Sequence, residues 1–184
     1  HAFAAGAAGA AETLTMAGEE PVVQDVPFWY TSSTVPGGTA TVSGTLTVAT
    51  AGTLALASDN TGTLDVNGRT IACGTLTLAT TNAGTVDLNN GTIDCVTFIH
   101  NGGTVTDTSA TLGGRITASG DVSGGASGTW SAGTLVFDGG AAIWTPGSVT
   151  WLNVEIAKSA AALTVSGTAQ VKGNVTLSGG SLAG

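Results

Sequence analysis

Two similar stretches decide the fold. Residues 64–78 read LDVNGRTIACGTLTL, and residues 86–100 read VDLNNGTIDCVTFIH. When Leu64 is aligned with Val86, the apolar, Asn, Thr, Ile and Cys positions of the two stretches coincide. Within each stretch apolar and polar residues alternate, which is typical of strands with one buried side. Because a repeat of this length is typical of solenoids, the sequence predicts an all-β protein, a β-solenoid (β-helix) with coils of about 22 residues.

Stacked coils would place equivalent residues in columns, about 4.8 Å apart. The predicted inward columns are Val42/Leu64/Val86, Ile71/Ile93, Ala51/Cys73/Cys95 and Leu54/Leu76/Phe98. The repeat weakens in the next coil, where Ile116 falls one place off the Ile71/Ile93 column. Residues 113–128 are therefore predicted to form a distorted coil or a loop.

The chain divides into three sections. Residues 1–38 are predicted to be an irregular N-terminal arm or attachment segment, because they combine an Ala-rich start with Pro21, Pro27 and Pro36. Residues 39–126 hold the clearest solenoid repeats. Residues 127–184 form a second section of short alternating strands, predicted to continue the solenoid, with a small β-sandwich as the alternative.

Composition excludes some classes of function. Only 9% of the 184 residues are charged, and four are Lys or Arg. So few cations cannot build a surface that follows a phosphate backbone, which disfavours nucleic acid binding. No apolar run approaches the length that a membrane-spanning helix needs. We also find no motif for a cofactor or a metal ion, and none is expected.

The second section carries a resemblance to known proteins. Its pattern is an Asp-Gly turn within residues 128–140, an aromatic-Leu-Asn-Val strand in 151–156, and strands in 163–168 and 173–177. This pattern resembles the repetitive β-rich segments of bacteriophage tail-fibre and spike-like proteins. It is equally similar to segments of large secreted bacterial adhesins. The resemblance implies a structural role at a virion surface or outside the cell, and it implies no catalytic residue.

The leading hypothesis is a non-enzymatic structural component of a phage virion surface or appendage: a tail fibre, a spike or a capsid decoration. The chain would be a stiff spacer or adhesion module that self-associates, with a trimer as one candidate, and contacts neighbouring structural proteins or surface carbohydrate. The alternative is a secreted bacterial adhesin or a self-assembling extracellular filament subunit. Lesser alternatives are an ice-binding protein and a spike that degrades polysaccharide.

The repeats carry three polar features. Asp65 and Asp87 should stack on one outer face, where a carboxylate pair about 5 Å apart could cleave glycosides; the favoured interpretation is a solvated surface ladder. His100 aligns with inward leucines and is interpreted as a local break in the coil rather than a ligand. Asn67 and Asn89 are predicted to stack at a turn in left-handed backbone.

Cysteine and threonine columns are the next candidates. Cys73 and Cys95 are predicted to stack as free thiols in the core, with a disulfide as the alternative. Ice-binding solenoids use two parallel threonine columns. Here Thr53, Thr75 and Thr97 complete only one.

Aromatic residues are the predicted interface, because they anchor many protein contacts. The residues are Phe28, Trp29, Tyr30, Trp130, Trp144 and Trp151. The first three are predicted to dock a neighbouring subunit. For the other three, packing in the core is the equally weighted alternative.

Overall fold

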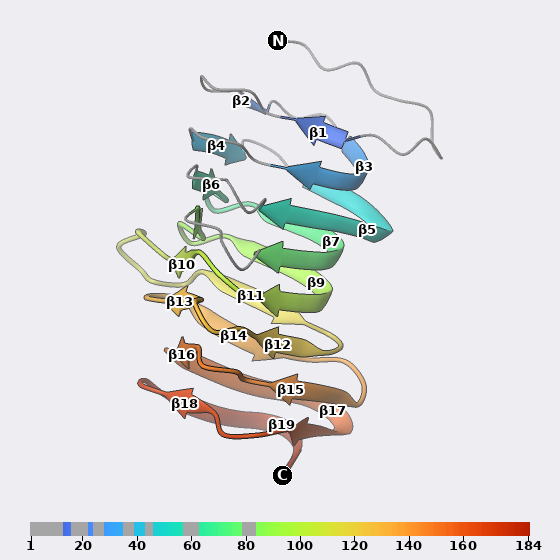
Figure 1. Cartoon of the computed structure of the whole chain (residues 1–184), viewed down its shortest axis with the longest axis vertical. Helices are drawn as coiled ribbons and strands as arrows, with labels where there is room; N and C mark the ends of the chain where they lie inside the picture. The colour runs from blue at the N-terminus through green and yellow to red at the C-terminus, as the bar shows by residue number, and fades with distance from the viewer. Residues whose placement is uncertain are drawn as a thin grey trace.

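The structure is a computed structural model, and its described part is a β-solenoid. Side chains are described for residues 63–78 and 84–184, and backbone alone for 13–15, 22–23, 28–34, 39–42 and 46–56. Over these residues every regular element is a strand, and the coils stack along one axis (Figure 1). The predicted all-β class and the predicted coil length are therefore confirmed.

All strand pairings of the described residues are parallel, in two sheets. The larger sheet has eleven of the described strands: β1 (Thr13–Thr15), β3 (Phe28–Thr34), β5 (Leu46–Leu56), β7 (Thr70–Leu78), β9 (Thr92–His100), β11 (Arg115–Ala118), β12 (Val122–Gly124), β14 (Thr134–Phe137), β15 (Ala142–Thr145), β17 (Asn153–Val165) and β19 (Val175–Ala183). The smaller sheet has eight: β2 (Val22–Val23), β4 (Thr39–Val42), β6 (Thr63–Asp65), β8 (Thr85–Asp87), β10 (Thr104–Thr106), β13 (Thr129–Trp130), β16 (Thr150–Trp151) and β18 (Gln170–Val171).

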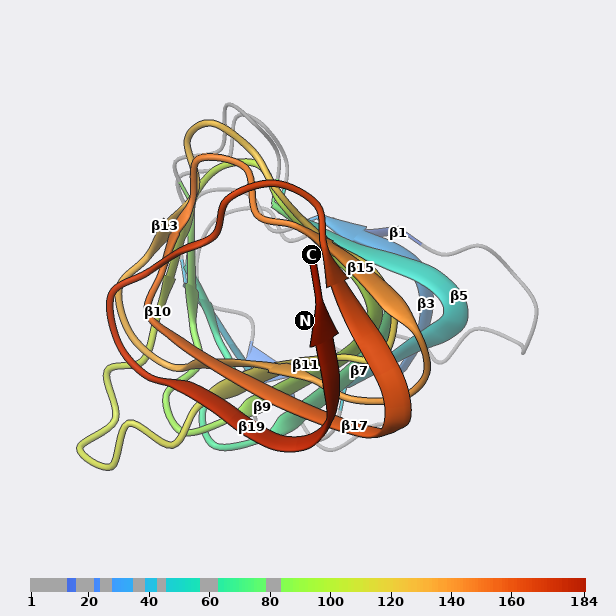
Figure 2. The same ribbon diagram turned by 90° about the horizontal axis from the view of Figure 1, so that it is seen from below.

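The coil has three sides. Strands β11 and β14 pair with the first halves of β9 and β17 and form the first face. Strands β12 and β15 pair with the second halves of β9 and β17 and form the second face. The smaller sheet is the third face. Viewed from below, β10 and β13 lie across the coil from the long strands that turn the corner between the other two faces (Figure 2).

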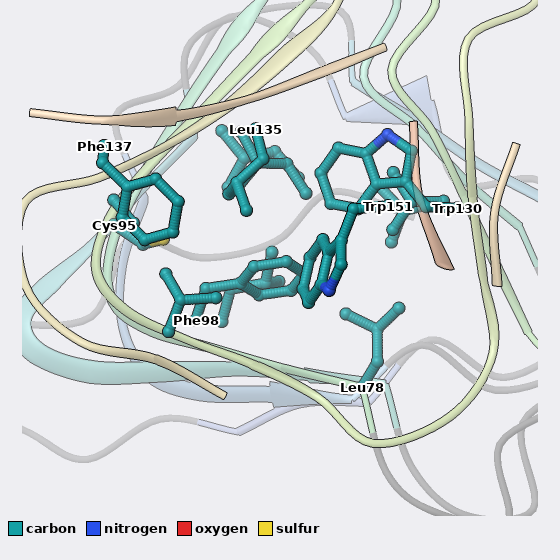
Figure 3. Packing of buried hydrophobic residues seen from close by; sticks show 14 of the residues in the cluster. Leu78, Cys95, Phe98, Trp130, Leu135, Phe137 and Trp151 are labelled. Carbon is teal, nitrogen blue, oxygen red and sulfur yellow. The ribbon is translucent and has the colours of Figure 1, made fainter. Parts of the chain in front are cut away.

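Inward side chains fill the coil with one continuous apolar core. Ile71, Ile93, Ile116, Leu135 and Val154 form one column, and each is at most 1% exposed. Figure 3 shows Phe98, Trp130, Trp151 and Leu135, which come from three coils, inside this core. Such a core follows from the alternating pattern, since each strand sends every second side chain inward.

The register corrects two predicted columns. Ala40, rather than Val42, is the partner of Leu64, because the interval from Thr39 to its partner Thr63 is longer than the regular period. Ile116 pairs directly with Ile93, so the predicted misfit at this position was wrong. The stretch 108–114 between β10 and β11 lengthens that coil slightly, and β11 and β12 then continue both faces. The predicted distorted coil at 113–128 is thus an in-register coil after a longer connection.

The sections at the two ends also contribute strands. Strands β13 to β19 continue the same two sheets, so the solenoid interpretation of residues 127–184 holds and the β-sandwich alternative does not. Strand β3 lies between Pro27 and Pro36 and pairs with β1 and β5. The prediction that prolines keep residues 21–38 irregular is therefore wrong for 28–34, because both prolines flank the strand and leave its N–H groups free to pair.

Close approach of two coils requires glycine at one corner. Gly147 has φ +61°, and a Cβ there would collide with the backbone carbonyl of Gly124 in the preceding coil. We expect Gly147→Ala to lower the free energy of unfolding by at least about 2 kcal/mol, from left-handed strain and the clash. Gly140→Ala is the matched control, since its Cβ would meet nothing within 4 Å. Urea titration checks both, and equal effects would contradict the prediction.

Candidate functional site

Asp65 and Asp87 stack one coil apart, as predicted. Both carboxylates are engaged in turns. Asp65 Oδ1 accepts hydrogen bonds from the Asn67 N–H (2.9 Å) and from Asn89 Nδ2 (3.1 Å). Asp87 accepts from the Asn89 N–H (3.1 Å), and from the N–H and hydroxyl of Thr108 (3.0 and 2.6 Å). The pair therefore acts as a polar ladder that holds the corner between the third and first faces.

The asparagines in this corner behave as predicted. Asn67 and Asn89 have φ of 51° and 42°, in the left-handed region that Asn tolerates better than most residues. Asn90 adds a third left-handed residue, with φ 64°. The Asn89 side chain donates to the Asp65 carboxylate in the preceding coil, so an amide and a carboxylate link the two turns.

Asp107 is a structural residue that sequence reasoning missed. Its carboxylate is 4% exposed and accepts from the N–H groups of Asn90, Ser109 and Gly114, and from the Ser109 hydroxyl. Burial alone would raise the pKa of Asp107, but these hydrogen bonds outweigh it and lower the pKa. The available signal was Asp-x-Ser, which favours an Asx turn. Asp107 thus closes the start of the longer connection to β11.

His100 lies in the core and does not break the coil. It is the last residue of β9, pairs with Leu78, and is 0% exposed. Phe98 stacks on the imidazole at 5.6 Å, and Trp130 and Trp151 meet it edge-on at 6.1 and 5.8 Å. The ring Nε2 lies 3.2 Å from the Thr129 carbonyl, and Nδ1 is buried without a partner. Burial lowers the pKa of His100 from 6.5 to about 4, so the ring is neutral at pH 7.

The three tryptophans of the second section lie in the core. Trp130, Trp144 and Trp151 are 4%, 3% and 0% exposed. Trp130 donates to the Gly133 carbonyl, and Trp151 donates to the Pro146 carbonyl. The structure therefore agrees with core packing and corrects their placement at an interface: their inward strand positions turn the rings away from any partner. Phe28, Trp29 and Tyr30 lie in β3, and their side chains are outside the described residues.

The two cysteines are free, buried and stacked, as predicted. Cys73 and Cys95 are Cα partners across β7 and β9. A hydrogen bond with the Cys73 thiol, together with burial, raises the pKa of Cys95 well above its ordinary value. Both sulfur atoms are buried, so reagents in solution do not reach them in the folded core.

Lys158 is a buried cation at the corner between the first and second faces. Its side chain is 1% exposed, and Nζ donates to the carbonyls of Asp138 (2.9 Å) and Gly140 (2.6 Å). Burial lowers the pKa of Lys158, while Asp138 and Asp121 oppose that shift. This side chain caps a turn of the preceding coil. Nearby, partial burial and the charge of Asp138 raise the pKa of Asp94.

The third face carries a threonine ladder. Six threonines of its described strands are successive Cα partners: Thr39, Thr63, Thr85, Thr104, Thr129 and Thr150. Thr63, Thr85, Thr104 and Thr150 are half-buried, and Thr129 is exposed. Sequence reasoning missed this ladder because its intervals are unequal, the shortest ending at Thr104 and the longest beginning there. The predicted column Thr53/Thr75/Thr97 also exists, on the second face.

The described residues contain no group of three His, Cys, Asp or Glu side chains that could hold a metal ion. Over the same residues, no helix has the length and apolar character to span a membrane. The comparisons found no match for this chain among protein-family models, curated proteins or solved structures.

Proposed function

We propose that this chain is a structural module, a stiff β-solenoid shaft displayed on a virion surface or in an extracellular appendage. One observation carries the proposal: the described strands form a stack of parallel coils, and three of its carboxylates, Asp65, Asp87 and Asp107, serve its own turns. Continuous backbone pairing between coils makes such a stack stiff along its axis. Groups already engaged in holding turns are poorly placed to act as acid or base.

The resemblance of residues 128–177 to tail-fibre and spike segments supports the virion surface as the location. In this proposal residues 1–38 attach the shaft to neighbouring structural proteins, with Phe28, Trp29 and Tyr30 in the contact, and copies of the shaft associate, with a trimer as the first expectation. A secreted adhesin or filament subunit has the same architecture and is the alternative.

The first test is the mass of the native assembly, with negative-stain images of the same sample. Short rods of trimer mass are expected. Long polymers would favour the filament subunit, and a compact monomer would rule out the bundled shaft. Incubation with capsular polysaccharides tests the enzyme alternative, because chain cleavage that Asp65→Asn and Asp87→Asn abolish would replace the structural proposal.

The threonine ladder favours a second candidate function, the binding of ice. Its hydroxyl and methyl groups recur at the strand spacing, about 4.8 Å. A rigid array of this kind can hold water in a repeating pattern, since bridging waters are nearly as favourable as direct hydrogen bonds. The ladder itself carries no charge. In two coils, however, Asp65 and Asp87 lie in the neighbouring column, so the uncharged surface is narrower there.

Thermal hysteresis and the shape of ice crystals test this second function. We expect the chain to shape ice, and Thr129→Lys to abolish the effect by placing a long charged side chain in the ladder. Thr145→Lys is the matched control, because Thr145 is also exposed but lies on the second face. An unmodified chain that leaves ice growth unchanged would reject ice binding.

A further inference from the structure

Cys73 and Cys95 are two paired thiols that could be oxidised, and the proposed structural role does not require this reaction. They are Cα partners on adjacent parallel strands, one coil apart, and both side chains point into the core. Cys73 is 6% exposed and Cys95 2%. The chain has two cysteines in all, so each has the other as its only intramolecular partner for oxidation.

The backbones of the two cysteines lie at a separation that a disulfide can span. Neighbouring strands lie about 4.8 Å apart, and Cα atoms joined by a disulfide lie about 4.4–6.8 Å apart. In the folded coil Cys95 Sγ lies 3.4 Å from the Thr117 carbonyl.

We propose that Cys73 and Cys95 form a disulfide that joins two consecutive coils when the chain folds in the presence of a small-molecule disulfide. One thiolate attacks the small-molecule disulfide, gives a mixed disulfide and releases one small thiol. The second cysteine then attacks the mixed disulfide, which forms the Cys73–Cys95 bond and releases the other small thiol. The two cysteines lose two protons and two electrons, and the electrons reduce the small-molecule disulfide.

Geometry sets when the bond forms and how strong it is. Burial of both sulfur atoms keeps an oxidant out of the folded coil, so oxidation accompanies folding. In-register Cβ atoms lie near the strand spacing, whereas a disulfide prefers about 3.5–4.5 Å between Cβ atoms. Closing the bond must draw the two coils together, and the resulting strain makes the bond easier to reduce than a relaxed one. The cross-link is therefore redox-sensitive, wherever the shaft is displayed.

Refolding in a glutathione redox buffer tests the proposal. The denatured chain is refolded with oxidised and reduced glutathione, and free thiols are then alkylated under denaturing conditions. We expect an intact mass that lacks two hydrogens and takes up no alkylating reagent, and a non-reduced digest that links the two cysteine peptides. Free thiols, glutathione adducts alone, or a disulfide between two chains would overturn the proposal.

Unfolding kinetics provide a second measurement. Closing a loop of one coil should slow unfolding of the oxidised chain by roughly tenfold or more relative to the reduced chain. Cys73→Ala/Cys95→Ala is the control, and its unfolding rate should not depend on the buffer. Equal rates for the oxidised and reduced wild-type chain would contradict the claim that the bond joins the coils.

Discussion

Replacing Trp151 by alanine will lower the free energy of unfolding by about 3–5 kcal/mol, as expected for removal of a buried indole ring. Trp151 is 0% exposed and lies 5.5 to 6.3 Å, between ring centroids, from Trp130, Trp144 and Phe98. Together with Trp151 these rings come from three coils, so the substitution removes contacts that hold several coils together. It also leaves the Pro146 carbonyl without its indole donor.

Chemical denaturation followed by circular dichroism measures this effect. Leu112→Ala is the control, because Leu112 is 59% exposed in the connection before β11, and changes at such sites usually stay within about 0.5 kcal/mol. Trp151→Phe should recover part of the loss, since it restores an aromatic ring without the N–H. If Trp151→Ala and Leu112→Ala had similar effects, the aromatic cluster would not be the centre of the core.

The fold was predictable because two adjacent coils repeat almost residue for residue. Thr70, Ile71, Cys73 and Thr75 meet their counterparts in β9 at the predicted offset. Outside these coils the corners vary in length, so a fixed period no longer aligns residues that are paired in the structure. Ile116 shows the reason: one additional residue before it shifts the sequence alignment but leaves the strand pairing with Ile93 intact.

The candidate site was less predictable than the fold. In a solenoid, strands of successive coils stay paired even when the connections between them differ in length. The sequence shows only the number of residues between similar positions. The threonine ladder could not be predicted because these numbers differ from coil to coil. The tryptophans were ambiguous for another reason. An aromatic ring in an alternating strand can point to either side. The burial of Trp130 and its pairing with the buried Val105 show that it points inward.

His100 makes acid sensitivity a specific expectation. Its pKa is lowered from 6.5 to about 4 by burial, so between these values the unfolded chain binds more protons than the folded chain. The free energy of unfolding then falls as the pH drops from about 6.5 to about 4, by about 3 kcal/mol in total. The side chains packed on the ring are Leu78, Phe98, Trp130 and Trp151, and none of them titrates.

His100→Leu should remove most of this pH dependence. The column already holds leucine at the equivalent place, since Leu78 is the partner of His100, so the apolar side chain should fit. We expect the variant to match the wild-type chain near pH 7 and to exceed its stability by about 3 kcal/mol near pH 4. Urea titrations at a series of pH values measure the difference.

The acid window distinguishes His100 from the carboxylates. Asp107 has a lowered pKa, so its contribution is present above its unfolded-state pKa of 3.8 and is lost only as the pH falls below that value. The contribution of Asp107 to stability therefore begins to fall at a pH at which the contribution of His100 is almost completely lost. Nuclear magnetic resonance of the imidazole protons gives the His100 pKa directly, because the chain has one other histidine, His1. A His100 pKa near 6.5 in the folded chain, or an unchanged pH profile in His100→Leu, would contradict the buried neutral ring.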